Sequence, residues 1–214
     1  MVITWYGQSC FKIVSEGLTI VIDPFHKEIG LRPPAFAADI VLSTHGQHND
    51  HSNVGAISGN PFIITGPGEY EVKGVSIFGV ESFHDNKEGQ EQGLNTIFSI
   101  ETEELKLCHL GDFGQDELSE AQGESINGPD VVFVPVGGNY TIGGTRAANL
   151  VNQIEPRIVI PMHYKIPGLA KDIDIEPVDR FLKEMGAGKK ESVEKLTIKK
   201  KTLPEQMEIV VMKL

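Results

Sequence analysis

The chain of 214 residues is long enough for one sizeable core, and its 40% hydrophobic and 23% charged content is typical of a soluble globular protein. Its 30 acidic residues outnumber its 19 basic ones, and the resulting net charge of −11 disfavours general binding to a nucleic-acid phosphate backbone. We find no signal segment and no run near the roughly 18 apolar residues of a membrane helix, so we expect a cytoplasmic protein outside the membrane.

Short strands dominate the expected structure of the first half of the chain. β-Branched and aromatic residues cluster between turn signals there, which is the pattern of strands. The expected strands are 2–5, 10–15, 18–22, 40–43, 62–65, 69–72, 75–80, 94–100 and 105–110. The segment 25–39 has prolines and no clear period and is predicted to be a long loop, while 52–58 is predicted to be a short helix.

Helical segments alternate with strands in the second half. The expected helices are 115–122, 144–153 and 177–185, and the expected strands are 130–135, 157–161, 194–199 and 207–213. We find no low-complexity linker and no short repeat, so the economical prediction is a single domain over residues 1–214.

The most informative stretch lies at residues 42–54. Three of the seven histidines of the chain fall there beside an aspartate: His45, His48, Asp50 and His51. Imidazole nitrogen and carboxylate oxygen suit Zn, Mn or Fe, and a short loop can direct several such groups at one point. A polar surface loop with incidental histidines is the alternative, but four potential ligands so close together favour a metal site.

Further potential ligands follow the ends of expected strands. They are His84, Asp112 and His163. In layered α/β folds the ends of neighbouring strands converge on one edge, so residues distant in sequence can meet there. We therefore expect these three side chains to complete the metal site.

In this order, the candidate ligands resemble the motifs of the metallo-β-lactamase superfamily, which run Asp, His-x-His-x-Asp-His, His, Asp, His. The matching positions are Asp23, the cluster 45–51, His84, Asp112 and His163. The amino-acid sequence at 22–25, 110–112, 135–141 and 160–164 is similar to that of the small hydrolases that include ascorbate-6-phosphate lactonase. The resemblance extends from about residue 2 to residue 165.

The resemblance implies a fold, a cofactor and a ligand set. The fold is α/β, a four-layer αβ/βα sandwich in which two mixed β-sheets are flanked by helices. The cofactor is a pair of divalent metal ions, with Zn expected and Mn or Fe as alternatives. The implied ligands are His45, His48 and His84 for the first ion, Asp50, His51 and His163 for the second, and Asp112 as the bridge. Asp23 is expected to steady the loop from behind.

Two departures from the family pattern are visible. Two residues, rather than one, separate His45 from His48. Either a bulge at Gly46 returns His45 to the metal, which we favour, or His45 is lost from the first site. The second departure is Gln8, which stands where relatives commonly have the histidine of Gly-His-Ser-Cys-Phe.

Two metal ions would bring the pKa of a water molecule toward neutrality, so no serine nucleophile is needed. We expect a metal-dependent hydrolase of a small ester, lactone or phosphoester, with Asp50 orienting the water and passing a proton to the leaving group. Tyr140, Tyr164 and Lys165 lie beside the site motifs and are candidates for substrate binding.

Three other functions stay open at this point. The chain could be a nuclease of the same fold, a metal-binding protein that has lost catalysis through the altered His45 spacing, or a redox variant with two irons. The expected partner is a small-molecule substrate, with no nucleic acid or membrane, and a homo-oligomer is possible because the terminal strands offer an edge.

Overall fold

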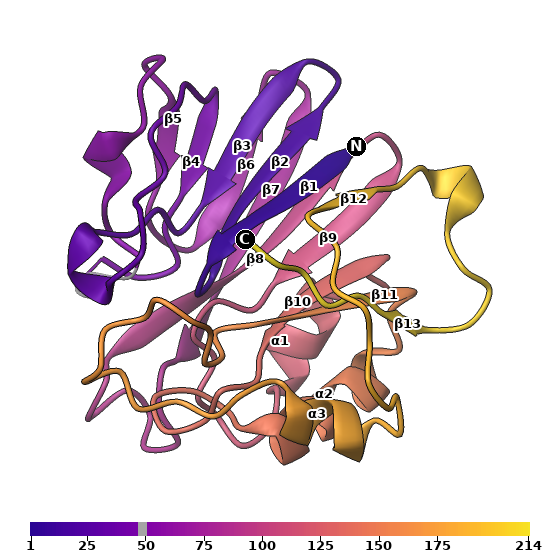
Figure 1. Ribbon diagram of the computed structural model, residues 1–214. Helices are drawn as coiled ribbons and strands as arrows, with labels where there is room; N and C mark the ends of the chain where they lie inside the picture. Colours follow the sequence, from indigo (N-terminus) through magenta and orange to yellow (C-terminus); the bar gives the residue numbers. More distant parts are fainter. Residues whose placement is uncertain (47–50) are drawn as a thin grey trace.

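The structure, a computed structural model, describes residues 1–46 and 51–214. Its two β-sheets pack against each other across one apolar core, and the three α-helices of the described residues are seen in the lower half of Figure 1. The expected sandwich of two mixed β-sheets is confirmed. The expectation of a single domain stays a prediction.

The first sheet has six strands in the order β12-β1-β2-β3-β4-β5. They are β1 (Val2–Gly7), β2 (Cys10–Ser15), β3 (Leu18–Ile22), β4 (Ile40–Leu42), β5 (Phe62–Ile64) and β12 (Lys195–Thr197). The pairs from β12 to β3 are antiparallel, whereas β3, β4 and β5 run parallel. The carboxyl ends of β3 and β4 therefore lie side by side, directly before Asp23 and the histidine cluster.

The second sheet has seven strands in the order β13-β11-β10-β9-β8-β7-β6. They are β6 (Gly68–Val72), β7 (Val75–Phe83), β8 (Leu94–Thr102), β9 (Leu105–His109), β10 (Val131–Pro135), β11 (Ile158–Met162) and β13 (Glu208–Ile209). Strands β6 to β9 form an antiparallel meander, and β9, β10, β11 and β13 run parallel. Strands β7, β9 and β11 consequently end at the same edge of this sheet.

Apolar side chains between the sheets form the main core. In β1 buried and half-buried residues alternate, because one face of the strand meets the other sheet. All five residues of β10 are buried, since the helix over residues 144–154 covers its second face. The rings of Phe11 from β2 and Phe133 from β10 lie 4.5 Å apart between their centroids and join the two sheets.

The outer layers of the sandwich differ. Helix α2 (Gly144–Ile154) packs on β10 and against α3 (Asp179–Glu184), while α1 (Glu120–Ser125) contacts β7. Over the six-stranded sheet, the predicted loop 25–39 covers a second apolar cluster, with Phe25, Ile29 and Leu31 among its buried residues. Extended chain and short 3-10 helices, η1 (Lys27–Ile29) and η2 (Val54–Ala56), therefore form much of that layer.

Several expected elements have other bounds in the structure. The helix expected at 115–122 begins only after Ser119, because this residue and Gln122 form a capping box that fixes the first turn. The helix expected at 52–58 is the single 3-10 turn η2, and that expected at 177–185 shortens to α3. The terminal strands β12 and β13 are also shorter than expected, and η3 (Lys200–Thr202) lies between them.

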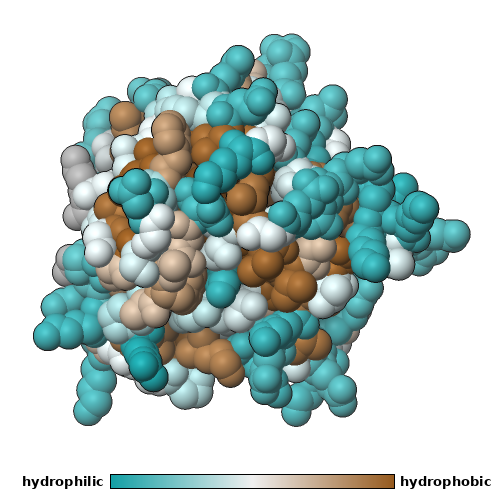
Figure 2. Space-filling view, turned by 90° about the horizontal axis from the view of Figure 1, so that it is seen from above, coloured by the Kyte–Doolittle hydropathy of each residue, from teal (hydrophilic) through white to brown (hydrophobic). Residues whose placement is uncertain are grey.

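Seen from above, the surface alternates between hydrophobic and hydrophilic patches (Figure 2). The large apolar side chains exposed within the described residues include Phe62 and Ile63 on the edge strand β5, and Leu94. Scattered apolar exposure of this kind is usual for folded proteins. In the described part of the chain, every helix is too short or too polar to span a membrane.

Candidate metal centre

The four described histidines predicted as ligands gather around one carboxylate, that of Asp112. His84 follows β7, Asp112 follows β9 and His163 follows β11, all at the same edge of the seven-stranded sheet. His45 and His51 come from the loop after β4 in the other sheet. The centre therefore lies where the edges of the two sheets meet.

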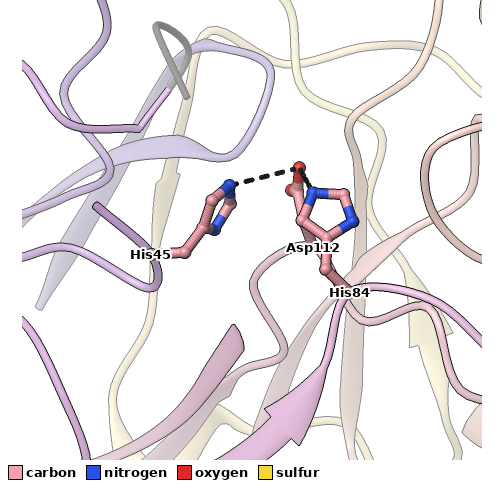
Figure 3. A group of neighbouring side chains, drawn as sticks. All are labelled: His45, His84 and Asp112. Carbon is pink, nitrogen blue, oxygen red and sulfur yellow. Dashed lines mark ion pairs between the residues drawn. The ribbon is translucent and has the colours of Figure 1, made fainter. Parts of the chain in front are cut away.

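A single oxygen of Asp112 is the focus of the cluster. Its Oδ2 lies 3.1 Å from His51 Nε2, 3.2 Å from His84 Nε2 and 3.3 Å from His163 Nε2. His45 Nε2 is 3.9 Å away, and Figure 3 shows His45 and His84 directing ring nitrogens at this carboxylate. The side chains form two triads: His45 with His84 and Asp112, and His51 with His163 and Asp112. Within each triad the potential ligand atoms lie within 4.8 Å of one another.

Burial and neighbouring charge set the protonation of the cluster. Burial lowers the pKa of His45 to about 3, which keeps its imidazole neutral, as a metal ligand must be. Burial alone would raise the pKa of Asp112, but His163 and His51 outweigh it and hold that pKa well below its usual range. The cluster thus offers an ionised bridging carboxylate and a neutral imidazole.

The backbone and neighbours of Asp112 fix its orientation. Ser9 Oγ donates a hydrogen bond to Asp112 Oδ1 at 3.0 Å, and the backbone N–H of Asp112 donates to Asn95 Oδ1 at 3.0 Å. Gly111 has φ +60°, and a Cβ there would lie 2.2 Å from Asn95 Oδ1. These contacts occupy Oδ1 and turn Oδ2 toward the histidines.

Asp23 holds the histidine loop from behind, as the sequence suggested. Its Oδ1 and Oδ2 accept hydrogen bonds from the backbone N–H and the hydroxyl of Thr44 at 2.7 and 2.9 Å. Asp23 Oδ2 also lies 3.0 Å from Nδ1 of His51. A carboxylate behind a ligand histidine fixes the ring and directs the opposite nitrogen at a metal. Nε2 of His51 is the nitrogen that faces Asp112.

One side chain, that of Ser43, contacts both ends of the histidine loop. Ser43 Oγ lies 3.0 Å from the carbonyl oxygen of His45 and 2.8 Å from that of His51. His45 is placed in its triad without a left-handed conformation at Gly46. His48 and Asp50 lie outside the described residues, so their roles, like the assignment of each ligand to an ion, stay predictions.

The three candidate substrate residues have different positions. Tyr140 is 36% exposed and lines the cavities at the centre. Tyr164 is instead in the core, where its ring centroid is 5.1 Å from that of Trp5 and its hydroxyl donates to the carbonyl of Met212. Lys165 is exposed, and its backbone N–H donates to Glu176. The position of Tyr164 thus differs from that of a substrate contact.

Within the described residues, two cavities that share His84 and Tyr140 open at the candidate centre. The smaller, about 280 Å³, is lined by Asp112, His84 and His163 together with Gln8 and Tyr140. The larger, about 860 Å³, shares His84 and Tyr140 with it and extends toward α2 and α3. A reacting molecule can therefore reach the histidines from a space large enough for a small metabolite.

Sequence reasoning missed Asp85, which shapes this entrance. Its two carboxylate oxygens accept four backbone hydrogen bonds, from residues 87, 89, 91 and 92. These bonds overcome the effect of burial and lower the pKa of Asp85 to about 2. The carboxylate therefore organises the loop that carries Gln92 to both cavities. The sequence signal that could have indicated this turn is Asp85 itself, four residues before Gly89.

Comparison with known proteins is consistent with the order and geometry of these residues. The family model described as the beta-lactamase superfamily domain matches residues 2–163. A UPF0173 metal-dependent hydrolase from Thermococcus onnurineus is 31% identical over 198 residues, which cover 79% of this chain and 88% of the relative. The chain belongs to the UPF0173 family of the beta-lactamase superfamily.

Solved structures agree with this membership. A protein of the metallo-beta-lactamase superfamily from Thermotoga maritima, described as a candidate zinc-dependent hydrolase, is 41% identical, with a TM-score of 0.80. The match covers 99% of this chain and 97% of that protein. An isothiocyanate hydrolase from Delia radicum gut bacteria has a TM-score of 0.70 at 13% identity over 99% of this chain and 96% of its own. At this low identity, the similarity to the isothiocyanate hydrolase shows a shared fold alone.

Proposed function

We propose that this UPF0173 protein is a hydrolase that uses two divalent metal ions to cleave a small ester, lactone or phosphoester. The observation that carries the proposal is the position of Asp112 Oδ2, within 3.3 Å of imidazole nitrogens from both triads. A carboxylate shared in this way is the arrangement expected of a bridge between two ions.

The donor set fits divalent cations. Imidazole nitrogens and an ionised carboxylate are ligands that Zn, Mn and Fe accept, and the residues of both triads are buried. His45, His84 and Asp112 would hold one ion, and His51, His163 and Asp112 the other. We favour zinc, in line with the description of the Thermotoga maritima protein. When bound, the ions would supply an activated water and a positive charge for the oxygen that becomes negative.

The residues of the chain would position the reactants. Asp112, fixed through Oδ1 by Ser9, would keep the two halves of the centre together. The smaller cavity would hold the scissile bond beside His84 and His163, while Tyr140 lines the path from the larger cavity. Asp50 would pass a proton to the leaving group, as the sequence predicts.

Several observations support a small substrate. The smaller cavity, about 280 Å³, suits a molecule of a few carbon atoms. The resemblance to ascorbate-6-phosphate lactonases favours a lactone or a phosphorylated compound among the candidates. The net charge of −11 disfavours a nucleic acid as the partner. We propose a free small molecule as the substrate and no membrane partner.

The test is a hydrolase screen coupled to metal analysis. Protein stripped by a chelator and reloaded with Zn, Mn or Fe is offered lactones, phosphodiesters, phosphotriesters, β-lactams and labelled RNA. We expect turnover of at least one small substrate, lost on chelation and reduced at least about a hundredfold in Asp112→Ala. Full activity of Asp112→Ala with unchanged metal content would contradict the proposal, and cleavage of RNA alone would favour a nuclease.

A further inference from the structure

The turn that carries Gln8 is fixed against the candidate metal centre. Gln8 lies between β1 and β2 with φ +48°, a left-handed conformation that residues other than glycine seldom adopt. Its carbonyl oxygen accepts hydrogen bonds from Trp5 Nε1 at 2.8 Å and from the backbone N–H of His163 at 3.2 Å. The backbone of Gln8 is therefore tied to the residue that closes one of the two triads.

The side chain of Gln8 is enclosed at the smaller cavity. The residue is 1% exposed, and it lines the cavity together with Asp112, His84 and His163. Within residues 1–46 and 51–214, Gln8 Oε1 has no hydrogen-bond partner. Buried polar atoms are nearly always paired, and an unpaired one lowers stability. The position of Oε1 at the cavity beside the candidate metal centre therefore points to a hydrogen-bond partner that is not part of the chain.

The neighbouring polar groups of the same turn are already engaged. Ser9 Oγ donates to Asp112 Oδ1, and the carbonyl oxygen of Ser9 lies 2.9 Å from His109 Nε2. These contacts stabilise the turn and orient Asp112 without the Gln8 side chain. Oε1 of Gln8 is thus available for recognition.

We propose that Gln8 Oε1 accepts a hydrogen bond from a hydroxyl group of the substrate and thereby determines specificity. This inference rests on the proposed hydrolase function and narrows its substrate class to hydroxylated esters, lactones or phosphoesters. A neutral amide suits this contact, because it adds no further charge beside the ionised Asp112 carboxylate. It would also leave substrates without the hydroxyl facing an unpaired buried oxygen, which disfavours them.

The test measures binding of product-like acids to the metal-loaded protein. The probes are butyrate and 2-, 3- and 4-hydroxybutyrate, with affinities from calorimetry. The variants are Gln8→Met, which keeps the length of the side chain and removes its hydrogen-bonding atoms, and Gln153→Met, a control at an exposed position of α2. Metal content and thermal midpoint are measured for each protein.

We expect the wild type to bind at least one hydroxybutyrate about tenfold more tightly than butyrate. In Gln8→Met that ratio should fall below about twofold, with metal content unchanged and butyrate bound at least as tightly as by the wild type, whereas Gln153→Met should retain the ratio. The thermal midpoint of Gln8→Met without ligand should rise, because an unpaired buried oxygen has been removed.

Three results would overturn the role of Gln8: no preference in the wild type, a preference retained in Gln8→Met, or equal weakening of all four acids. If Gln8→Met fails to fold, a crystal structure of the wild type with the preferred acid decides, since the ligand hydroxyl must lie within hydrogen-bond distance of Oε1. Absence of any hydrolysis with hydroxyl-selective binding intact would count against the proposed function alone. Hydrolysis without hydroxyl selectivity would count against Gln8 alone.

Discussion

At the residue scale, the candidate centre depends on carboxylates with different tasks. Asp112 presents one oxygen to four histidines, while Asp23 stands behind the loop and contacts Thr44 and His51. Both are buried, but Asp112 lines the cavity, whereas Asp23 lies behind the histidine loop and stabilises it. The same residue type thus serves as candidate ligand and as support.

Asp23→Asn should weaken metal binding without removing it. The amide cannot provide two acceptor oxygens for Thr44 and His51, so the His51 ring loses its fixed orientation. We expect the zinc affinity, measured by competition with a chelator, to fall about 10- to 100-fold. Asp39→Asn, at an aspartate that pairs with Lys73, serves as the control. An unchanged affinity of Asp23→Asn would show that the His51 ring does not depend on this carboxylate.

At the element scale, the strand ends place the site, and the turns after them orient the side chains. Gly111 is the sharpest example, because it joins β9 to Asp112 with φ +60° beside Asn95 and Thr44. A Cβ at this position would lie 2.2 Å from Asn95 Oδ1 and 2.8 Å from Thr44 Cβ. The turn therefore admits glycine alone without a shift of its neighbours.

Gly111→Ala should destabilise the fold and displace Asp112. We expect the free energy of unfolding to fall by at least about 2 kcal/mol, from the clash and the left-handed backbone together. Gly123→Ala is the matched control, because Gly123 lies inside α1 and a Cβ there meets nothing within 4 Å. That change should raise the free energy of unfolding by about 0.5 kcal/mol. Denaturant titration measures both, and equal effects at the two positions would refute the argument.

Sequence periodicity predicted the elements better than it predicted the contacts. Strands such as β2 and β3 follow directly from β-branched residues between turn signals, and His84 and His163 follow strand ends as expected. Ser9 was missed, because its bond to Asp112 joins positions 103 residues apart. The nearness of Tyr164 to His163 in the sequence predicts a substrate contact, whereas in the structure Tyr164 packs on Trp5 and bonds to Met212 in the core.

At the scale of the whole molecule, polar contacts join segments of the two sheets besides the apolar core. Asp39, before β4, pairs with Lys73 in the turn between β6 and β7 at 2.5 Å. Asp39 also accepts a hydrogen bond from the backbone N–H of Thr19 at 2.9 Å. The bond from Lys73 and that from Thr19 lower the pKa of Asp39.

This contact should make part of the stability dependent on pH. Because the folded-state pKa of Asp39 is the lower one, its contribution is complete above the unfolded value of about 3.9 and is lost as the pH falls through the folded-state pKa. Lys73 is 56% exposed, so solvent screening limits the contribution to about 0.5 kcal/mol. A double-mutant cycle of Asp39→Asn and Lys73→Met at pH 7 and pH 3 measures it. A coupling energy that grows at pH 3 would reverse the predicted sign.

The central claim is that two metal ions share Asp112, and metal stoichiometry in purified variants tests it most directly. The wild type and the control His26→Ala, at a histidine outside both triads, should each bind two ions per chain. His84→Ala and His163→Ala should each lose one, because each removes a ligand from a different triad. Asp112→Ala should lose both at the same free metal concentration. Two tightly bound ions in Asp112→Ala, or a single ion in the wild type, would contradict the shared centre.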